Sequence, residues 1–369
     1  MINQILYSLR ILFKYRLYSG ISLIGLGIAI SSFWFITNFV KNSHQYDAFH
    51  QNHDRIYRLT MEVTAGGSTD HYATTGKPLG SLLTQNYSGI SVFAKMNLYG
   101  NIVVQVNDEL FKEEGFFNVN PGTLDVFTFD FLDGDKTTCF ANPNSILLSR
   151  SLAEKYFNKV EVVDQEITID EIPYNVKGVF EDWPENSHLD VSALFYSEVA
   201  AQNYEPQDWF DLEQYNYVLL DPANDQNDLN NKLAQLNVQY VTPILEGSGM
   251  DVKFNSQPLN ELYFDPGLID DVPKGNLLYI HALAFAGLLV LLIAGLNYIN
   301  LSLTQSTQRT KEILLKKILG ISRKQLLLQS VIESWTMTLL VLMISAVLIF
   351  TFNNVYFEYT SYQAIDITG

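Results

Sequence analysis

Three long apolar segments alternate with polar sequence along this chain. The longest stretch without a charged residue runs for 34 residues and has Leu277–Leu303 at its centre. Tyr18–Val40 is also uncharged, and Val331–Phe357 carries only Glu333. About 20 apolar residues suffice for a helix to cross a bilayer at 1.5 Å rise per residue. The pattern therefore predicts three transmembrane helices, at residues 18–40, 277–303 and 331–352.

The long segment between the first two apolar stretches has a mixed pattern. Runs rich in β-branched and aromatic residues predict strands at Arg55–Val63, Asn101–Val106, Ile146–Ser149, Tyr174–Phe180 and Tyr215–Leu220. Ser151–Phe157 and Asp228–Tyr240 have helical patterns, the second with Asn227 or Asp228 as its N-cap. We therefore expect a membrane protein in which a large α+β domain of two lobes, residues 41–276, lies between helices 1 and 2.

The sequence in and before the first span has two further helical features. Apolar residues recur at helical spacing before Lys14, which indicates an amphipathic helix over residues 1–17 at the cytoplasmic membrane interface, or an extension of the first span. Small residues in the first span predict close packing against another helix; they are Gly20, Gly25, Gly27, Ala29, Ser31 and Ser32.

Residues 304–330 have the pattern of a short helical hairpin. Ser306–Ile318 is helical in composition, and Gly320 follows it where a C-terminal cap belongs. Ser322 and Gln325 have the spacing of a capping box that opens the next helix. The hairpin could anchor the chain on anionic lipid, but its defined turn and caps favour a docking element.

Basic residues indicate how the chain is oriented. Residues 1–17 carry three Lys or Arg and no acid, residues 304–330 carry six against one acid, and no basic residue follows Lys324. Cytoplasmic loops are enriched in Lys and Arg. We therefore expect the N-terminus and the hairpin to be cytoplasmic, and residues 41–276 and an end loop at 353–369 to lie outside.

The expected outer domain is strongly acidic. It holds 14 of the chain's 23 basic residues and 36 of its 40 acidic residues, a formal charge of about −22. This charge excludes nucleic acid as a partner on that side. Cys139 is the chain's one cysteine, so the sequence contains no intrachain disulfide and no cysteine-based zinc site.

Motifs for catalysis are missing from the sequence. Gly76-Lys77 is followed by Pro78 and not by the Ser or Thr of a nucleotide-binding loop, and no G-x-S-x-G or H-E-x-x-H sequence occurs. We therefore expect no catalytic, cofactor-binding or metal-binding residue in this chain. Ser187, His188 and Asp190 adjoin in sequence, which does not identify a nucleophilic triad.

Two groups of polar residues allow alternative interpretations. His44, Asp47, His50, His53 and Asp54 are close together after the first span, but without a recognised ligand spacing we interpret them as polar surface and not as a zinc site. Glu333 is either a functional acid inside the third span or a hydrated residue at its cytoplasmic end.

Two segments of the expected outer domain resemble a known family. Phe49–Arg58 (FHQNHDRIYR) resembles the F-H-x-n-x-d-r-i-Y-R segment that follows the first span in MacB/FtsX-type ABC transporter permeases, and is closest to the Bacteroidetes-type branch. Trp183–Leu189 (WPENSHL) is similar to the P-x-N-S-H-L element of that branch's MacB-like periplasmic core domain.

The more specific similarity is to the FtsX-like domain. Ala294–Ser302 (AGLNYINLS) and Arg309–Gly320 (RTKEILLKKILG) are similar to its N-F/Y-I-N-L and R-x-K-E-I-x-x-R-K-x-x-G-A motifs, and Gln329 with Glu333 matches its Q-x-x-x-E-S end. Leu314-Leu315-Lys316 departs from the usual G-[IV]-R, and Lys keeps the charge of Arg but not its bidentate geometry.

The resemblance implies a mechanotransmission permease subunit of the bacterial inner membrane. ATP and Mg²⁺ would bind a separate cytoplasmic ABC ATPase, whose hydrolysis would move the periplasmic domain to export a peptide, an antibiotic or a lipophilic molecule. The alternatives are a lipoprotein-releasing or hydrolase-activating complex and, in another class, a membrane-anchored ligand receptor. Further expected partners are a second copy or second permease half, the lipid bilayer and a periplasmic adaptor.

The resemblance also implies roles for particular residues. ATPase coupling is expected of Arg309, Lys311, Glu312, Lys316, Lys317 and Gly320. Structural roles are expected of Phe49, His50, Tyr57, Arg58, Pro184, Ser187, His188, Asn297, Asn300 and Glu333. The family continues with a fourth span, so we expect this chain to be a fragment or an N-terminal half.

Overall fold

The computed structural model separates the chain into two units. It describes residues 16–43, 45–107, 109–184, 186–197, 204–265, 267–272, 275–308 and 310–360. The helical unit consists of the described residues before His44 and after Asn276, and the inserted domain is Gln45–Asn276. The interface helix expected over residues 1–17 lies outside the described residues, except for 16 and 17.

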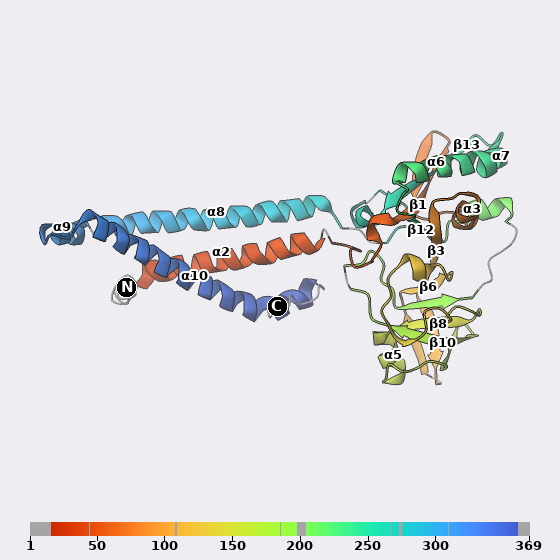
Figure 1. Ribbon diagram of the computed structural model, residues 1–369, viewed down its shortest axis with the longest axis horizontal. Helices are drawn as coiled ribbons and strands as arrows, with labels where there is room; N and C mark the ends of the chain where they lie inside the picture. Colours follow the sequence, from red (N-terminus) through yellow and green to blue (C-terminus); the bar gives the residue numbers. More distant parts are fainter. Residues whose placement is uncertain are drawn as a thin grey trace. The chain divides into compact units, whose positions relative to one another are not determined.

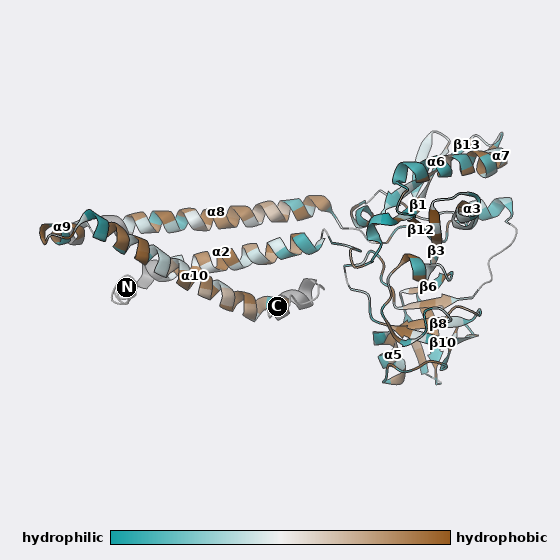
Figure 2. Ribbon diagram, in the orientation of Figure 1, coloured by the Kyte–Doolittle hydropathy of each residue, from teal (hydrophilic) through white to brown (hydrophobic). Residues whose placement is uncertain are grey.

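The helical unit contains three long apolar helices. It comprises α2 (Arg16–Ser43), α8 (Leu277–Gln308), α9 (Thr310–Ile318) and α10 (Arg323–Thr360) (Figure 1). Within the described residues, Gly20–Ser43, Leu277–Thr304 and Arg323–Asn353 are long and apolar enough to cross a membrane. Figure 2 shows their predominantly hydrophobic colouring. The prediction of three membrane-length apolar helices around a large domain is confirmed.

Small residues bring α2 close to its neighbouring helices. A Cβ on Gly27 would lie 2.8 Å from Cγ2 of Ile344 in α10, and one on Gly287 in α8 would lie 3.0 Å from Cδ1 of Ile36. Ser31 donates a hydrogen bond to the Gly27 carbonyl (2.8 Å), and Ser345 donates to the same oxygen from α10 (3.1 Å). Close packing and such hydrogen bonds are what hold helices together in lipid. The predicted packing of the first span is confirmed at Gly27.

The third helix is longer than the sequence suggested. An end loop was expected at 353–369, but α10 continues to Thr360, and residues 361–369 lie outside the described residues. The correction has a simple reason, because residues 323–360 contain no Pro or Gly to end the helix.

The inserted domain is built on one mixed sheet. The described residues form thirteen strands in it: β1 (Ile56–Ala65), β2 (Ser68–Tyr72), β3 (Ile90–Tyr99), β4 (Ile102–Val106), β5 (Glu109–Glu113), β6 (Phe116–Val119), β7 (Phe131–Gly134), β8 (Ser145–Ser149), β9 (Glu166–Ile169), β10 (Ile172–Phe180), β11 (Ala193–Tyr196), β12 (Tyr215–Leu220) and β13 (Met250–Pro258). Their order is β13-β1-β12-β3-β6-β11-β8-β10-β9-β4-β5, with β2 on β1 and β7 on β10. The pairs β8–β10 and β6–β11 are parallel.

Short helices cover parts of this sheet. They are α3 (Pro78–Asn86), α4 (Thr123–Val126), α5 (Arg150–Phe157), α6 (Gln226–Leu236), α7 (Thr242–Leu245), the 3₁₀ turns η1 (His53–Arg55), η2 (Pro206–Trp209) and η4 (Leu259–Phe264), and the π-turn η3 (Asn237–Val241). The expected cap of α6 was wrong: its N-cap is Asp225, whose carboxylate accepts from the Asp228 N–H (2.9 Å), because Gln226 and Asn227 are already helical.

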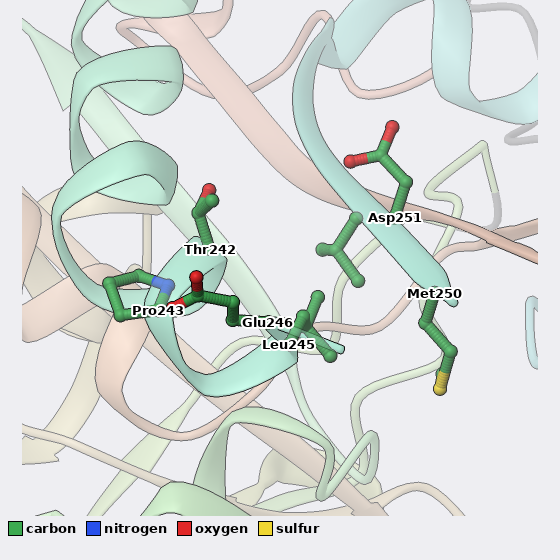
Figure 3. Close-up of a pocket in the computed structure, with 7 residues that line it drawn as sticks. Thr242, Pro243, Leu245, Glu246, Met250 and Asp251 are labelled. Carbon is green, nitrogen blue, oxygen red and sulfur yellow. The ribbon is translucent and has the colours of Figure 1, made fainter. Parts of the chain in front are cut away.

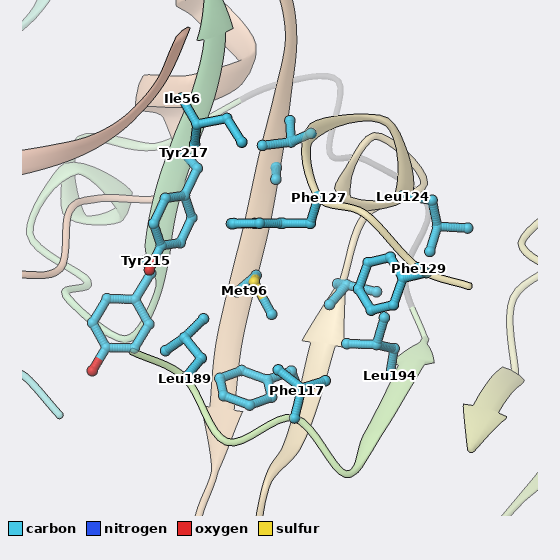
Figure 4. Packing of buried hydrophobic residues seen from close by; sticks show 14 of the residues in the cluster. Ile56, Met96, Phe117, Leu124, Phe127, Phe129, Leu189, Leu194, Tyr215 and Tyr217 are labelled. Carbon is cyan, nitrogen blue, oxygen red and sulfur yellow. The ribbon is translucent and has the colours of Figure 1, made fainter. Parts of the chain in front are cut away.

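The domain has three clusters of buried apolar side chains along this one sheet. The central cluster includes Phe117, Phe127 and Tyr217, as Figure 4 shows. A second cluster lies under α5 with β8 and β10, and a third lies under α3 and α6 with β1 and β13. The two lobes expected from the sequence are therefore parts of a single compact unit.

Candidate functional site

The hairpin between α9 and α10 turns at Gly320. This glycine has φ +84, its N–H donates to the Lys317 carbonyl (3.2 Å), and the Ile321 N–H donates to the Lys316 carbonyl (3.1 Å). These two bonds form a Schellman motif, which needs the left-handed conformation that glycine adopts readily. The predicted cap is confirmed.

A capping box opens α10 directly after this turn. The Ser322 N–H donates to Gln325 Oε1 (3.0 Å), and the Gln325 N–H donates to Ser322 Oγ (3.3 Å). Lys316 Nζ also donates to Gln329 Oε1 (3.4 Å), which connects the two arms. The hairpin is therefore a defined structural element, as its sequence predicted.

The surface of the hairpin is apolar as well as basic. Ile318 and Leu319 are each 81% exposed, and further exposed apolar side chains are Ile313, Leu314, Leu315, Leu327 and Leu328. Lys317 is exposed and Lys316 half-buried. Arg309 lies outside the described residues; Lys311 and Glu312 belong to α9, and their side chains are outside the description.

The chain enters the inserted domain through a turn that is tied to the 186–188 segment. Asp47, four residues after the end of α2, has φ +59. Its N–H donates to the Asn186 carbonyl (2.9 Å), and Asn186 Nδ2 donates to the Gln45 carbonyl (3.0 Å). These backbone contacts fix the first residues of the domain.

Buried side chains complete this connection. His188 Nδ1 donates to Asp47 Oδ1 (2.8 Å), Ser187 Oγ donates to the same oxygen (3.2 Å), and His188 Nε2 lies 2.7 Å from the Tyr217 hydroxyl. Burial raises the pKa of Asp47, but the His188 ring and its hydrogen bonds outweigh it and hold this pKa below the ordinary value. We call Asp47, Asn186, Ser187, His188 and Tyr217 the entry cluster.

His50 lies next to the entry cluster among aromatic rings. Its Nδ1 accepts from the Thr128 N–H (3.1 Å), and its ring contacts Phe49, Phe127 and Trp183. Burial lowers the pKa of His50 to about 3, so the ring is neutral at physiological pH. Among the described residues, no group of three or more His, Cys, Asp and Glu could hold a metal ion.

The chain leaves the domain through a second buried cluster. Arg58 in β1 donates two hydrogen bonds of 2.8 Å to the carboxylate of Asp271, which lies six residues before α8. Arg58 also donates to Gln257 Oε1 (2.9 Å). Burial lowers the pKa of Arg58, but its hydrogen bonds to Asp271, together with the electrostatic effect of Asp271, Tyr215 and Tyr217, raise the pKa above the ordinary value. We call Arg58, Gln257 and Asp271 the exit cluster.

The two connections also contact each other within the inserted domain. The rings of Tyr46, beside Asp47, and Tyr263, in η4, stack with centroids 3.4 Å apart and an interplanar angle of 9°. The Gly275 N–H donates to the Tyr263 carbonyl (2.9 Å). The segments that follow α2 and precede α8 are therefore joined to one another and to the sheet.

The remaining motif residues occupy varied positions. Tyr57 is half-buried against the cluster under α3 and α6, and the Pro184 carbonyl accepts from the Ser187 N–H (3.1 Å). Asn297 and Asn300 are exposed on α8, and Glu333 is half-buried on α10.

Sequence reasoning missed the partners of the motif histidine and arginine. His188 binds Asp47 and Tyr217, and the adjacent Asp190 is exposed. Asp47 and His50 did stand out within the polar group after the first span, but their interpretation as polar surface was wrong, because both residues are buried. Nothing local in the sequence marks Tyr46, Asp271 or Tyr217, because their partners are far away along the chain.

Comparison with known proteins gives two domain matches. Residues 19–236 match the MacB-like periplasmic core domain, and residues 284–368 match the FtsX-like permease C-terminal domain. The chain is 22% identical over 232 residues to the uncharacterized ABC transporter permease YknZ of Bacillus subtilis (strain 168), which covers 62% of this chain. It spans about half the length of that relative, 52%.

The solved structures that match this chain have low similarity to it. A domain of a permease protein from Porphyromonas gingivalis has a TM-score of 0.49 at 16% identity, covering 63% of this chain and 98% of that one. The periplasmic region of MacB from Actinobacillus actinomycetemcomitans has a TM-score of 0.35 at 13% identity, covering 52% and 87%. Its two domain matches and its apolar helices show that this chain belongs to the MacB/FtsX-type ABC transporter permeases, which are membrane proteins with a large extracellular domain.

Proposed function

We propose that this chain is a mechanotransmission subunit, in which ATP hydrolysis on a separate cytoplasmic ATPase moves the inserted domain. The observation that carries the proposal is that both covalent connections between the helical unit and this domain are held by buried polar clusters. Asp47 secures the connection after α2, and Asp271 secures the one before α8. The exported cargo we propose is a peptide, an antibiotic or a lipophilic molecule.

The energetics of the two clusters suit connections that transmit a displacement. Removing one partner of a buried ion pair costs about 3–5 kcal/mol, because the other charge stays buried without compensation. Arg58 and Asp271 are 0% and 4% exposed, so pulling their segments apart would carry this penalty. A displacement of α2 or α8 would therefore move the domain as a packed unit before the connections gave way.

The hairpin supplies the other end of the proposed coupling. Its turn is fixed by Gly320 and the capping box, and its surface offers exposed Ile318 and Leu319 beside Lys317. A partner that bound two positions of this hairpin with different affinities would shift the helices between two states. We propose that an ABC ATPase subunit is this partner.

The proposed topology follows from the basic residues. The hairpin and the N-terminal residues carry most of the Lys and Arg outside the inserted domain, which favours the cytoplasmic side for both. We therefore propose that the inserted domain is periplasmic in a bacterial inner membrane.

The side chains exposed on α8 support a further helical partner. Asn297 and Asn300 are exposed amides on a predominantly apolar helix. Polar side chains on transmembrane helices form hydrogen bonds across helix interfaces, where unpaired groups are costly. We propose that a second copy or second permease half covers them.

A co-purification experiment tests the docking proposal. Replacing Lys311, Glu312, Lys316 and Lys317 with Ala should abolish recovery of the co-expressed cognate ATPase, while membrane insertion stays normal. The matched control removes three exposed Lys and one exposed Glu from the inserted domain: Lys112, Lys159, Lys253 and Glu109. ATPase recovery at the wild-type level from the hairpin variant would refute the assignment.

A further inference from the structure

The inserted domain contains a polar pocket that neither connection uses. Its cavity of about 180 Å³ is lined by residues of β3, β6 and β11 and of the neighbouring loops, and ten of its thirteen lining residues carry a polar group. A larger depression of about 420 Å³ lies between α7 and β13, as Figure 3 shows, where Leu245 and Met250 stand beside Glu246 and Asp251. The smaller pocket contains the more informative chemistry.

Strand register gathers the polar side chains of the smaller pocket. Asn97 in β3 pairs with Asn118 in β6, so both side chains project from the same face of the sheet. Met96 and Phe117 each precede one of these two residues, so their side chains project from the other face, where they belong to the central apolar cluster. The pattern therefore concentrates amides on one face without weakening the core.

Asn120 shapes this pocket. Its Oδ1 accepts from the Lys95 N–H (2.7 Å), and its Nδ2 donates to the Phe93 carbonyl (3.1 Å). Both ends of this amide are therefore satisfied by the backbone of β3, and its place at the pocket wall is fixed.

The side-chain oxygen of Asn118, which also lines the pocket, has no hydrogen-bond partner among the described residues. The residue is 3% exposed, and its Nδ2 donates to Ser197 Oγ (2.6 Å). Its Oδ1 is buried and has no hydrogen-bond partner among the described residues. Buried polar atoms are nearly always paired, because leaving one unpaired costs about 1–3 kcal/mol. Asn118 is therefore a lining residue of the pocket with an acceptor that the described residues leave unused.

We propose that this pocket binds a single sugar residue of a glycan. Its polar lining contains four amide side chains, of which Asn120 is already satisfied by the backbone, and three tyrosines. Amides and phenols both donate and accept hydrogen bonds, as sugar hydroxyls do. Tyrosine rings also offer apolar faces to the C–H side of a sugar ring. Only Phe93, Val119 and Pro121 line the pocket without a polar side-chain group, so it is poorly suited to a lipid or an apolar peptide side chain.

Charge and size support a neutral, small ligand. Lys77 is paired with Asp211 at 2.5 Å, and the pocket balances Lys95 with Glu213 among its lining residues. Pockets for drug-sized ligands span about 300–1,000 Å³, and this one is smaller. One ring of a longer glycan matches that size better than a whole oligosaccharide does.

Saturation-transfer NMR on the full chain in lipid nanodiscs tests this proposal without any ATPase. The probes are N,N′-diacetylchitobiose, maltose and mannobiose, with trialanine as a peptide comparison. We expect transfer to the ring protons of at least one disaccharide. Asn118→Leu and Asn97→Ala should each weaken it by about fivefold or more, the effect of one lost hydrogen bond.

Two controls make the outcome decisive. Asn142→Ala removes an exposed amide outside the pocket and should leave the transfer unchanged. If Asn118→Leu fails to fold, the half-buried Asn97 still provides the test. Absence of transfer to all three disaccharides, or transfer that both pocket variants retain, would overturn the proposal. Asn118-dependent transfer to trialanine alone would assign the pocket to peptides and also overturn it.

Discussion

Arg58 and Asp271 form a bidentate ion pair between two segments that are 213 residues apart in sequence. Arg58 belongs to β1, the first strand after α2, and Asp271 belongs to the last segment before α8. Both side chains are buried, and Gln257 binds the same guanidinium. The pair therefore links the first strand of the inserted domain to its last segment, the two places where the chain connects to the helical unit.

Breaking this pair should destabilise the inserted domain strongly. Asp271→Ala leaves the Arg58 guanidinium buried and uncompensated, and we expect a loss of about 3–5 kcal/mol in the free energy of unfolding. Chemical denaturation of the full chain in detergent measures it, followed by tryptophan fluorescence with Trp34 and Trp335 of the helical unit replaced by Phe, so that Trp183 and Trp209 report on the inserted domain. Asp70→Ala on exposed β2 is the control and should change stability by about 0.5 kcal/mol or less.

Removing both charges of this pair should cost less than removing one. Arg58→Met combined with Asp271→Leu leaves no isolated buried charge, so we expect this double variant to be more stable than Asp271→Ala. A double variant that is less stable than the single one would show that polar contacts such as that to Gln257 dominate.

The buried His50 predicts a stability that depends on pH. Its ordinary pKa is 6.5, and burial lowers the pKa to about 3 in the folded domain. Between these two values only the unfolded state takes up the proton, so stability falls as the pH is lowered, by up to about 1.4 kcal/mol per pH unit. Unfolding free energies measured from pH 7 to pH 4 should show this slope.

An isosteric variant isolates the contribution of His50. His50→Asn keeps an acceptor near the Thr128 N–H but does not titrate, so its stability should vary less over the same pH range. An unchanged slope would assign the pH dependence to other groups. Asp47, whose pKa is also lowered, contributes only as the pH falls below its ordinary value of 3.8.

Gly320 should be sensitive to any residue that disfavours a positive φ. At φ +84, Gly320→Val should strain the turn by about 1–2 kcal/mol, whereas Gly320→Asn tolerates this conformation better. We expect recovery of the cognate ATPase to fall in Gly320→Val and to stay closer to the wild-type level in Gly320→Asn. Equal recovery of the ATPase from the two variants would show that docking does not depend on the conformation of this turn.

Exposed amides on α8 should lie at a helix–helix interface. Asn297→Cys and Asn300→Cys should each form disulfide-linked dimers in membranes, and a control at exposed Val347 in α10, Val347→Cys, should form fewer. The native Cys139 should not interfere, because burial raises the pKa of its thiol to about 11. Crosslinks at Val347→Cys alone would place the interface on α10.

Local patterns in the sequence predicted the local structure well. The expected strands correspond to β1, β4, β8, β10 and β12, and the turn at Gly320 with the Ser322 capping box was read from adjacent residues. These features depend on spacing within a few residues, so one sequence contains the whole signal.

Other elements were missed for different physical reasons. β13 does alternate, since Val252 and Phe254 are buried whereas Asp251, Lys253 and Asn255 are exposed, and this usable signal was overlooked. β6 is buried on both faces and shows no alternation. The entry and exit clusters could not be predicted, since His188 lies 141 residues from Asp47 and no local spacing relates them.

Distances between the two units under ATP test the central claim most directly. Spin labels on Asp70→Cys in β2 and Thr351→Cys in α10, both at exposed positions, report the separation of the inserted domain from the helical unit. With the cognate ATPase present, we predict that ATP shifts the distance distribution in the wild-type chain but not in the hairpin variant, which does not bind the ATPase. Identical distributions with and without ATP, while the ATPase stays bound and hydrolyses ATP, would contradict mechanotransmission.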